Sequence, residues 1–582
     1  MRTAVILAIG GLVWVGQQQP QRDSSNQVVQ PAGSISGVVL DAAAEPAPLH
    51  RVVLTLRGPS LGAGRLAVTD VDGRFSFPGL SAGNFTIEAE RAGYVRTFYG
   101  SNLLGKGPGL AVAVGEGETV GDLKIQMIRG GVVSGAVRDA YGRPQANAEV
   151  SLVPLATRTG LPEAGRLVTI RTTSTGSYRA HGLTPGRYVV AVQPGFNYNG
   201  AAQYSREQLD ALMSMTARAS QGDLPEAANA PAGYAPTFFP GASDVRSAAA
   251  VTVEPGQETG GIDVALQFVR TTRLEGRVIA PSGLDVKDVQ LRIESSGLAL
   301  AGLELRSYMG TGPAAGMNIP VRDGAFQRVG LTPGRYSLIA RASATQAAGT
   351  VTLWGVADVE VSGQSVLPLS LELHRTMTIA GTMDIGPGSS SMRPDLPVVL
   401  RSAEGNATLT RRTTARSDGS FSFPDVAPGR YWIDPDSVAR SDWRTIRVTR
   451  DGTDLVDGPL TVSAGQNVSG LRVSASDLPA LKGRLVDSAD RPATGYVIVV
   501  YAIDKNQWTN DRRIHIARPA TNGQYSVPPL PKGEYFVSAA PDVDPADLSD
   551  PAFFEMASPS ALKVVVDPGR AQNLDLRIPG RF

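Results

Sequence analysis

Short segments of alternating apolar and polar residues, separated by glycine-containing turns, run along most of the 582-residue chain. Alternation with a period of two is typical of β-strands that bury one face. One 18-residue pattern occurs five times, and its copies begin at Asp72, Thr175, Asp323, Asp418 and Asn522. This repetition predicts five β-modules in tandem.

Each copy predicts a hairpin followed by a second turn. An Asp-Gly or Asn-Gly pair between alternating segments is a strong hairpin signal, because glycine accepts the positive φ of a tight turn. Phe75 and Phe77 then share one face of the next strand. The Pro-Gly step that follows in later copies, for example Pro185-Gly186, predicts a type II turn. Tyr188 then opens the buried face of another strand.

Two further features frame every copy. An opening strand with the pattern apolar-x-Gly precedes it, with glycines at Gly37, Gly135, Gly276, Gly381 and Gly483. A closing pair of strands follows it, around turn glycines at Gly115, Gly256, Gly363, Gly465 and Gly569. About seven short strands per module predict a β-sandwich, so the expected fold class is all-β.

The repeat spacing divides the chain into five modules. Their expected bounds are 33–129, 130–270, 271–375, 376–476 and 477–582. Because the linkers are short, they predict a stiff, extended array. Module 2 is longer than the others, which predicts an insertion at 196–241. Within it, 205–221 predicts one short helix with Ser205 as a possible N-cap.

The first residues predict an export signal. Arg2 is followed by an uncharged, largely apolar run at 3–16, and a polar linker at 22–32 precedes the first module. We expect 1–21 to be a signal peptide, with an uncleaved anchor as the alternative. The protein is then expected in the periplasm, on the outer cell surface or outside the cell.

Composition excludes several classes of function. The chain has 55 Lys+Arg and 54 Asp+Glu, so its net charge of +1 creates no field that would attract nucleic acid. It has no cysteine, which excludes disulfides, thiolate nucleophiles and Cys-ligated metals. Beyond the signal segment we expect no integral membrane domain.

Catalytic motifs have simpler structural interpretations. The four histidines, at His50, His181, His374 and His515, lie in different modules and at different repeat positions. The Gly-x-Ser-x-Gly match at 79–83 aligns with the ordinary turn of the repeat and lacks the helix that a nucleophile elbow requires. Asp70 and Asp72 fit a hairpin turn better than a calcium loop. We therefore expect no enzyme activity, no cofactor and no metal site, while a carboxylate-based glycoside hydrolase remains an alternative.

Exposed aromatic rings are the remaining candidates for binding, because sugar rings stack on flat aromatic faces. Trp432 lies between Tyr431 and Ile433, which the pattern turns inward, so its indole is expected to point outward. Further candidates for ligand binding are Trp443, Trp508, Tyr198 and Tyr234. The alternative interpretation is that these rings cover loops and module junctions.

The five copies of turn-F-x-F-x-x-L-x-P-G-x-Y-x-V resemble the carboxypeptidase regulatory-like repeats, which form a transthyretin-like sandwich grouped with carbohydrate-binding-like folds. The match is close in modules 2 to 4, whereas Gly83 and Gly533 lack the preceding proline. The resemblance implies an accessory, non-catalytic fold. The function expected is thus an exported binding or scaffold array at the cell envelope, whose partner is an envelope protein or, alternatively, a polysaccharide.

Overall fold

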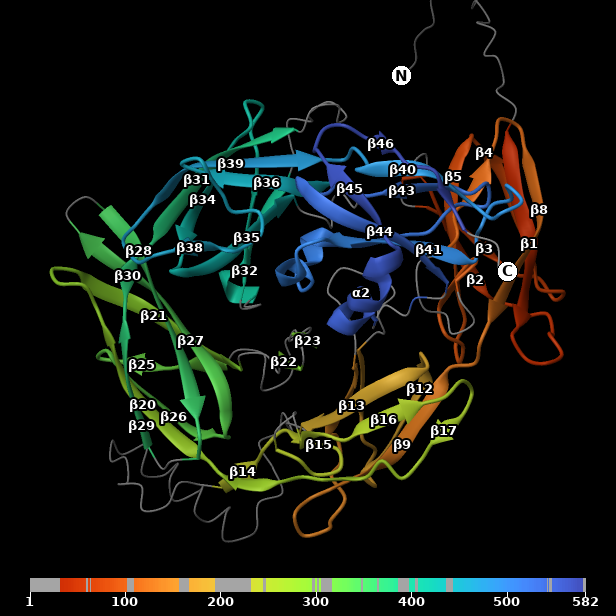
Figure 1. Ribbon diagram of the computed structural model, residues 1–582. Helices are drawn as coiled ribbons and strands as arrows, with labels where there is room; N and C mark the ends of the chain where they lie inside the picture. Colours follow the sequence, from red (N-terminus) through yellow and green to blue (C-terminus); the bar gives the residue numbers. More distant parts are fainter. Residues whose placement is uncertain are drawn as a thin grey trace, which may run out of the picture.

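The computed structural model describes residues 32–578, except for 59–60, 63, 102–108, 156–166, 194–231, 244–246, 296–298, 301–302, 305–316, 347–348, 364–365, 386–396, 404–406, 436–442, 542 and 544–546. Strands dominate the described residues, as the alternating pattern predicts (Figure 1). None of the helices in these ranges is both long and apolar enough to cross a bilayer. The expected signal peptide and the helix at 205–221 lie outside the described residues.

Module 1 shows the arrangement that the others repeat. Its first sheet has the order β4-β1-β8, in which β1 runs antiparallel to β4 and parallel to β8. Its second sheet has the order β3-β2-β5-β6, and β7 also pairs with β5. The strands are β1 (Gly33–Asp41), β2 (Val53–Arg57), β3 (Arg65–Val68), β4 (Arg74–Leu80), β5 (Gly83–Glu90), β6 (Thr97–Phe98), β7 (Val112–Val114) and β8 (Thr119–Met127).

Module 2 builds its first sheet as β12-β9-β17, with β18 also on β9, and its second as β11-β10-β13-β15, with β16 also on β13. A separate ribbon, β14-β19, leads towards module 3. The strands are β9 (Gly131–Arg138), β10 (Glu149–Pro154), β11 (Val168–Arg171), β12 (Ser177–Leu183), β13 (Gly186–Gln193), β14 (Ala232–Tyr234), β15 (Thr237–Phe238), β16 (Ala250–Val253), β17 (Glu258–Thr259), β18 (Val264–Ala265) and β19 (Phe268–Arg270).

Module 3 has the sheets β25-β26-β20-β29 and β24-β21-β27-β28-β30, and a small ribbon β22-β23. Its strands are β20 (Thr272–Ile279), β21 (Asp285–Ser295), β22 (Ala299–Leu300), β23 (Leu303–Glu304), β24 (Met317–Ile319), β25 (Val321–Arg322), β26 (Ala325–Leu331), β27 (Gly334–Gln346), β28 (Gly349–Val361), β29 (Val366–Glu372) and β30 (His374–Arg375).

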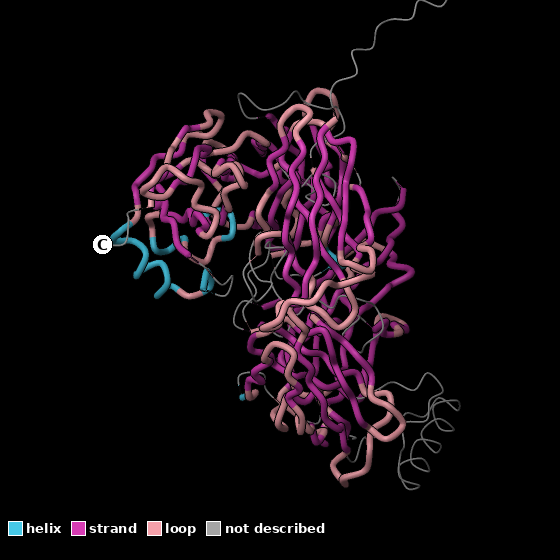
Figure 2. Tube along the Cα trace, turned by 90° about the vertical axis from the view of Figure 1, so that its right-hand side faces the viewer, coloured by secondary structure: helices cyan, strands magenta, loops and turns pink. Residues whose placement is uncertain are grey.

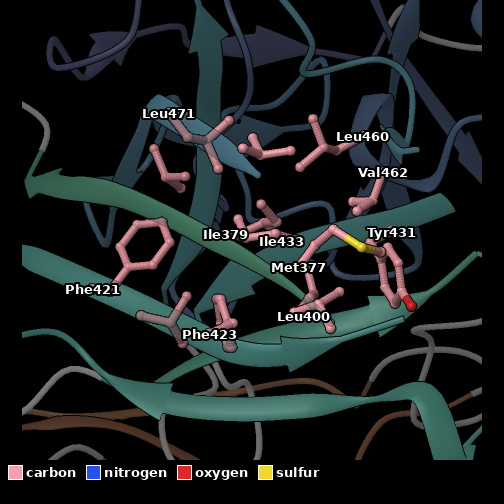
Figure 3. Packing of buried hydrophobic residues seen from close by; sticks show 14 of the residues in the cluster. Met377, Ile379, Leu400, Phe421, Phe423, Tyr431, Ile433, Leu460, Val462 and Leu471 are labelled. Atoms are coloured by element: carbon pink, nitrogen blue, oxygen red, sulfur yellow. The ribbon is translucent and has the colours of Figure 1, made fainter. Parts of the chain in front are cut away.

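Module 4 has the sheets β34-β31-β39-β36-β37 and β33-β32-β35-β38. Its elements are β31 (Met377–Ile385), β32 (Pro397–Ser402), the 3-10 helix η2 (Ala407–Leu409), β33 (Arg411–Thr414), β34 (Ser420–Val426), β35 (Gly429–Pro435), β36 (Arg444–Arg450), β37 (Thr453–Asp454), β38 (Leu460–Val462) and β39 (Val468–Ser476). Met377, Phe421, Phe423, Tyr431 and Leu471 meet between these two sheets (Figure 3).

Module 5 has the sheets β43-β40-β46, with β47 also on β40, and β42-β41-β44-β45. Its elements are β40 (Leu481–Val486), β41 (Tyr496–Ala502), η3 (Lys505–Gln507), η4 (Asp511–Arg513), β42 (Ile514–Ala517), β43 (Gln524–Val527), β44 (Gly533–Pro541), η5 (Asp547–Ser549), α2 (Pro551–Ala557), η6 (Ser558–Ser560), β45 (Leu562–Val566), β46 (Gln572–Asn573) and β47 (Leu576–Arg577).

The apolar-x-Gly pattern has a direct physical cause. The opening strand passes so close to the parallel closing strand that a side chain does not fit. A Cβ built on the opening-strand glycine would lie 2.1–2.4 Å from a closing-strand carbonyl oxygen in every module, at Gly37, Gly135, Gly276, Gly381 and Gly483. Real Cβ atoms do not approach an oxygen this closely, so only glycine is compatible with the crossing.

The repeated tyrosine also serves the backbone. In modules 2 to 5 its hydroxyl donates a hydrogen bond of 2.7–2.9 Å to the carbonyl four residues earlier, from Tyr188, Tyr336, Tyr431 and Tyr535. A buried hydroxyl needs a hydrogen-bond partner, and here the partner is a carbonyl of the preceding turn. The bond therefore links this turn to the strand that follows it. Module 1 has Phe85 at this position and therefore lacks the bond.

The turn type predicted for the Pro-Gly steps is wrong. Gly186, Gly334 and Gly429 have φ of 152° to 156°, far from the value near +80° of a type II turn. The reason is the tyrosine two residues later, whose ring folds back over the glycine. A Cβ on Gly429 would lie 3.3 Å from the ring of Tyr431, so glycine here leaves room for the ring.

The described part of module 5 contains a helix that the pattern did not predict. Helix α2 begins after Asp550, whose carboxylate accepts a hydrogen bond from the backbone N–H of Ala552, and Pro551 stands at its first turn. Its Phe554 is fully buried against Tyr501 and Trp508, with ring centroids 4.8 and 5.3 Å away. The helical segments gather mainly in the part of the molecule that holds the C-terminus (Figure 2).

The array follows a curved path. The short linkers predict a stiff, extended chain. In Figure 1, however, the modules form a curve that begins with module 1 at the right, continues through modules 2, 3 and 4, and ends with module 5 beside module 1. Thr521 of module 5 donates its backbone N–H to the Ala111 carbonyl at 2.9 Å, and its hydroxyl accepts the Ala113 N–H at 3.2 Å. The curvature has a physical cause, since modules pack through sheet faces as well as through their ends.

Replacing Gly381 with alanine tests the glycine constraint. The new Cβ meets the Leu471 carbonyl at 2.4 Å and the Phe421 ring at 2.9 Å, so we expect a loss of about 3 kcal/mol of stability in module 4. Amide exchange of 377–476 measures it. Gly458→Ala is the matched control, because nothing lies within 4 Å of its Cβ. Equal protection of the two variants would contradict the constraint.

Candidate functional site

The two buried tryptophans do not form a binding surface. Only 5% of Trp443 and 4% of Trp508 is exposed to solvent. Trp443 belongs to the core of module 4, whereas Trp508 packs on the outer side of a module 5 sheet and donates its indole N–H to the Ala502 carbonyl at 2.9 Å. The expectation that these two rings are exposed is therefore wrong, because both are buried.

The other candidates have different surroundings. Tyr234 lies in β14, is half-buried and packs against the core of module 2. Burial raises the pKa of its hydroxyl. Tyr198 lies outside the described residues. The structure therefore does not bring the five sequence candidates together into one surface.

Trp432 points outward, as alternation predicts, but its ring contacts module 5. Tyr431 and Ile433 on either side are buried in the core. The guanidinium carbon of Arg512 lies 4.8 Å from the centroid of the Trp432 ring. This distance is typical of a cation–π contact, so the ring covers a junction between modules.

Asp434 follows two residues later on β35 and anchors the same junction. Its carboxylate accepts hydrogen bonds from Arg512 at 2.6 Å, Arg401 at 2.8 Å and the Thr445 hydroxyl at 3.0 Å. Burial alone raises the pKa of this carboxyl, but the charges of Arg512 and Arg401 outweigh burial and hold the pKa below its ordinary value. Asp434 is therefore ionised at neutral pH, and Arg512 binds it across the junction.

A second ion pair lies beside the first. Arg513 donates two hydrogen bonds to the Asp457 carboxylate, at 2.6 and 2.8 Å, and Asn510 donates a third at 3.0 Å. Arg513 also donates to the Tyr535 hydroxyl at 2.9 Å, which connects the junction to the repeated tyrosine of module 5. Bidentate arginine pairs fix geometry as well as contribute energy.

The sequence pattern did not predict that these charged residues form a junction. Their one available signal is alternation along β35, which puts Asp434 on the same outward face as Trp432. The arginines belong to η4, a three-residue 3-10 helix that replaces regular repeat sequence and has no periodic pattern. Asn510 caps it by accepting the N–H of Arg512, a local signal for a turn and not for a junction.

The junction also contains a small hollow. It encloses about 10 Å³ and is lined by residues that include Ser476, Leu478, Leu530, Asp567 and Arg570. A cavity of this volume holds about one water molecule. Typical small-molecule pockets enclose about 300–1,000 Å³. Among the described residues, moreover, no group of three or more His, Asp or Glu side chains is placed to hold a metal ion. The geometry at this site is that of a structural joint.

Acid should loosen this joint. A carboxyl with a lowered folded pKa contributes stability that is present above its ordinary pKa of 3.8 and is lost as the pH falls through the folded value. We expect the fluorescence of Trp432 to stay constant from neutral pH to about pH 4, then to change as Arg512 leaves the ring. A Trp432→Phe difference spectrum isolates this signal.

Asp434→Asn is the control for that titration. Its amide cannot bind Arg512 as an ion pair, so the low-pH change in Trp432 fluorescence should disappear. An unchanged titration in Asp434→Asn would contradict the role given to this carboxylate.

Comparison with known proteins gives one family match. The profile of the carboxypeptidase regulatory-like domain matches residues 34–126 and 132–216. No curated protein matches the chain.

Solved structures match at low identity. The Bacillus anthracis TIE protein is 10% identical, with 76% of this chain and 73% of that chain covered and a TM-score of 0.16. The streptococcal ancillary pilin is 13% identical, with 53% and 100% covered and a TM-score of 0.17. BcpA, the major pilin subunit of Bacillus cereus, is 13% identical, with 60% and 100% covered and a TM-score of 0.13.

The family match falls on the first two modules. Both matched segments begin within an opening strand, at β1 and β9, and both contain the glycine of the close strand crossing. Residues 34–126 and 132–216 are therefore similar to the carboxypeptidase regulatory-like domain.

Proposed function

We propose that this protein is an exported, non-catalytic scaffold that holds interaction surfaces at fixed positions at the cell envelope. The observation that carries the proposal is the use of the repeated residues. The five opening-strand glycines make room for a backbone carbonyl, and four repeated tyrosines donate their hydroxyls to the backbone. A catalytic group needs a reactive atom free to reach a substrate, whereas these residues maintain shape.

Close junctions support the same role. Between modules 1 and 2, the Gly130 N–H donates to the Gly93 carbonyl at 3.0 Å, and a Cβ on Gly130 would lie 2.4 Å from the backbone of Gly182. Between modules 3 and 4, Trp354 of β28 joins the hydrophobic cluster of module 4. Joints that are packed and hydrogen-bonded keep surfaces at fixed separations, which is what a scaffold requires.

Export gives the first test. Removal of 2–21 should leave the protein in the cytoplasm, whereas the full chain should be recovered from the envelope or the medium, because the apolar run at 3–16 directs secretion. Cell fractionation with immunoblotting measures both forms. Because the deletion keeps every described residue, folding of the cytoplasmic form is an internal control. Recovery of the full chain from the cytoplasm would contradict the proposed location.

Sugar recognition through Trp432 is the competing function, and a polysaccharide array tests it. If the protein is a scaffold, replacing Trp432 should not change polysaccharide binding, because Arg512 already lies over its ring. Trp432→Ala is the direct comparison. Val71→Ala, at an exposed position in module 1, is the control for the loss of a surface apolar group. Binding that Trp432→Ala alone abolishes would favour sugar recognition over the scaffold.

A further inference from the structure

In four modules the outer face of the second sheet carries covered residues. In module 2, Val153, Val189 and Phe238 form a cluster packed against Ala242 and Ala248. In module 3, Ile339 and Trp354 pack into module 4. In module 4, Arg512 covers Trp432, and in module 5, Phe554 of α2 covers Tyr501. Each cover is part of this chain.

In module 1 three apolar residues on this face are exposed. Leu66 is 71% exposed, Val68 59% and Val53 42%. These three side chains share the outer face, because Val68 pairs with Val53, and Leu66 pairs with Thr55. The alternate residues of β2, Leu54 and Leu56, are fully buried in the core. The exposed residues therefore belong to the outer face of the second sheet, while the inner face is well packed.

These residues also lie at a free edge. Strand β3 ends the order β3-β2-β5-β6, and β7 pairs with the other side of β5, where Thr521 contacts it. The contact with module 5 therefore occupies the opposite side of the sheet. Among the described residues, no strand pairs with the outer edge of β3.

The equivalent edges of modules 2 and 4 are polar, whereas in module 5 the outward residues of β42, Ile514 and Ile516, are apolar and belong to the cluster around Phe554. In β11 of module 2 the outward residues are Thr169 and Arg171, and in β33 of module 4 they are Arg412 and Thr414. Charged and polar edge residues prevent sheets from joining edge to edge. Their replacement by leucine and valine in β3 removes that protection from module 1.

We propose that β3 pairs with β3 of a second copy of this chain, which extends the second sheets of two modules 1 into one sheet. An antiparallel pairing about a two-fold axis at Ala67 places Leu66 opposite Val68 of the partner subunit. The strand is thus complementary to itself. Together with Val53, the two copies form one continuous apolar stripe across the joined sheet.

The charges around the stripe permit this pairing. Glu88 and Glu90 lie on β5, two strands from the joined edge, opposite Thr55 and Val53. At about 4.8 Å per strand, glutamates of the two copies in one row are roughly 24 Å apart, beyond the Debye length of about 8 Å. Arg65 is turned to the first sheet, where it binds the carbonyls of Pro78 and Gly79.

The size of the contact sets its strength. A four-residue edge strand buries an area at the low end of interfaces, below about 1,200 Å² in total. The dimer is therefore weak and forms by mass action at high protein concentration. A heterologous partner that adds a strand to β3 would compete for the same edge.

Sedimentation velocity of the secreted full chain over a wide concentration series tests the pairing. The wild type should approach twice the monomer mass at high concentration. Leu66→Lys and Val68→Lys should stay monomeric, and their exposed positions preserve the fold, which thermal melting verifies. Thr169→Lys, the matched edge position of module 2, should dimerise like the wild type.

A wild type that remains monomeric throughout, or a Leu66→Lys variant that still dimerises, overturns the proposal. The register has its own test, because the chain contains no cysteine. Ala67→Cys should form a disulfide-linked dimer on mild oxidation. Its failure to do so in a dimerising protein overturns the two-fold pairing at Ala67. Loss of dimerisation leaves export and folding unchanged, so this test is independent of the proposed scaffold function.

Discussion

Apolar residues on the outer face of the second sheet must be covered, and this requirement organises the molecule. A sandwich buries only the inner faces of its two sheets, so an apolar outer face needs another element against it. In module 5 that element is α2, and in module 3 it is the neighbouring module, through Trp354. Because neighbours pack on sheet faces, the array curves instead of running straight.

Polar contacts then fix what apolar packing brings together. At the junction of modules 4 and 5, the Trp432 ring gives Arg512 a surface, and Asp434 gives it a charge partner. Arg513 and Asp457 form a second, bidentate pair beside it. Such contacts are directional, so they select one orientation among the many that packing alone would allow.

Much of this fold could be predicted from sequence, because strand alternation and turn glycines are local signals. The five opening-strand glycines were found as a pattern, although their reason, a carbonyl at 2.1–2.4 Å, needs three dimensions. The junction could not be predicted, since Asp434 and Arg512 are 78 residues apart. Alternation along β35 turns Asp434 outward but does not identify its partner. Trp443 and Trp508 were expected to be exposed, but neither lies in a strand, so alternation gives no signal for them. Trp443 belongs to the core of module 4, and Trp508 packs against Phe554 of α2.

The distance between modules 1 and 5 tests most directly whether covered sheet faces determine the path of the chain. Ala44 and Ala489 are exposed, and the chain has no cysteine, so Ala44→Cys and Ala489→Cys give one specific pair of spin labels. Packed junctions predict a single narrow distance distribution that matches the curved array. A broad distribution, reaching the separations of a straight chain of five modules, would contradict it.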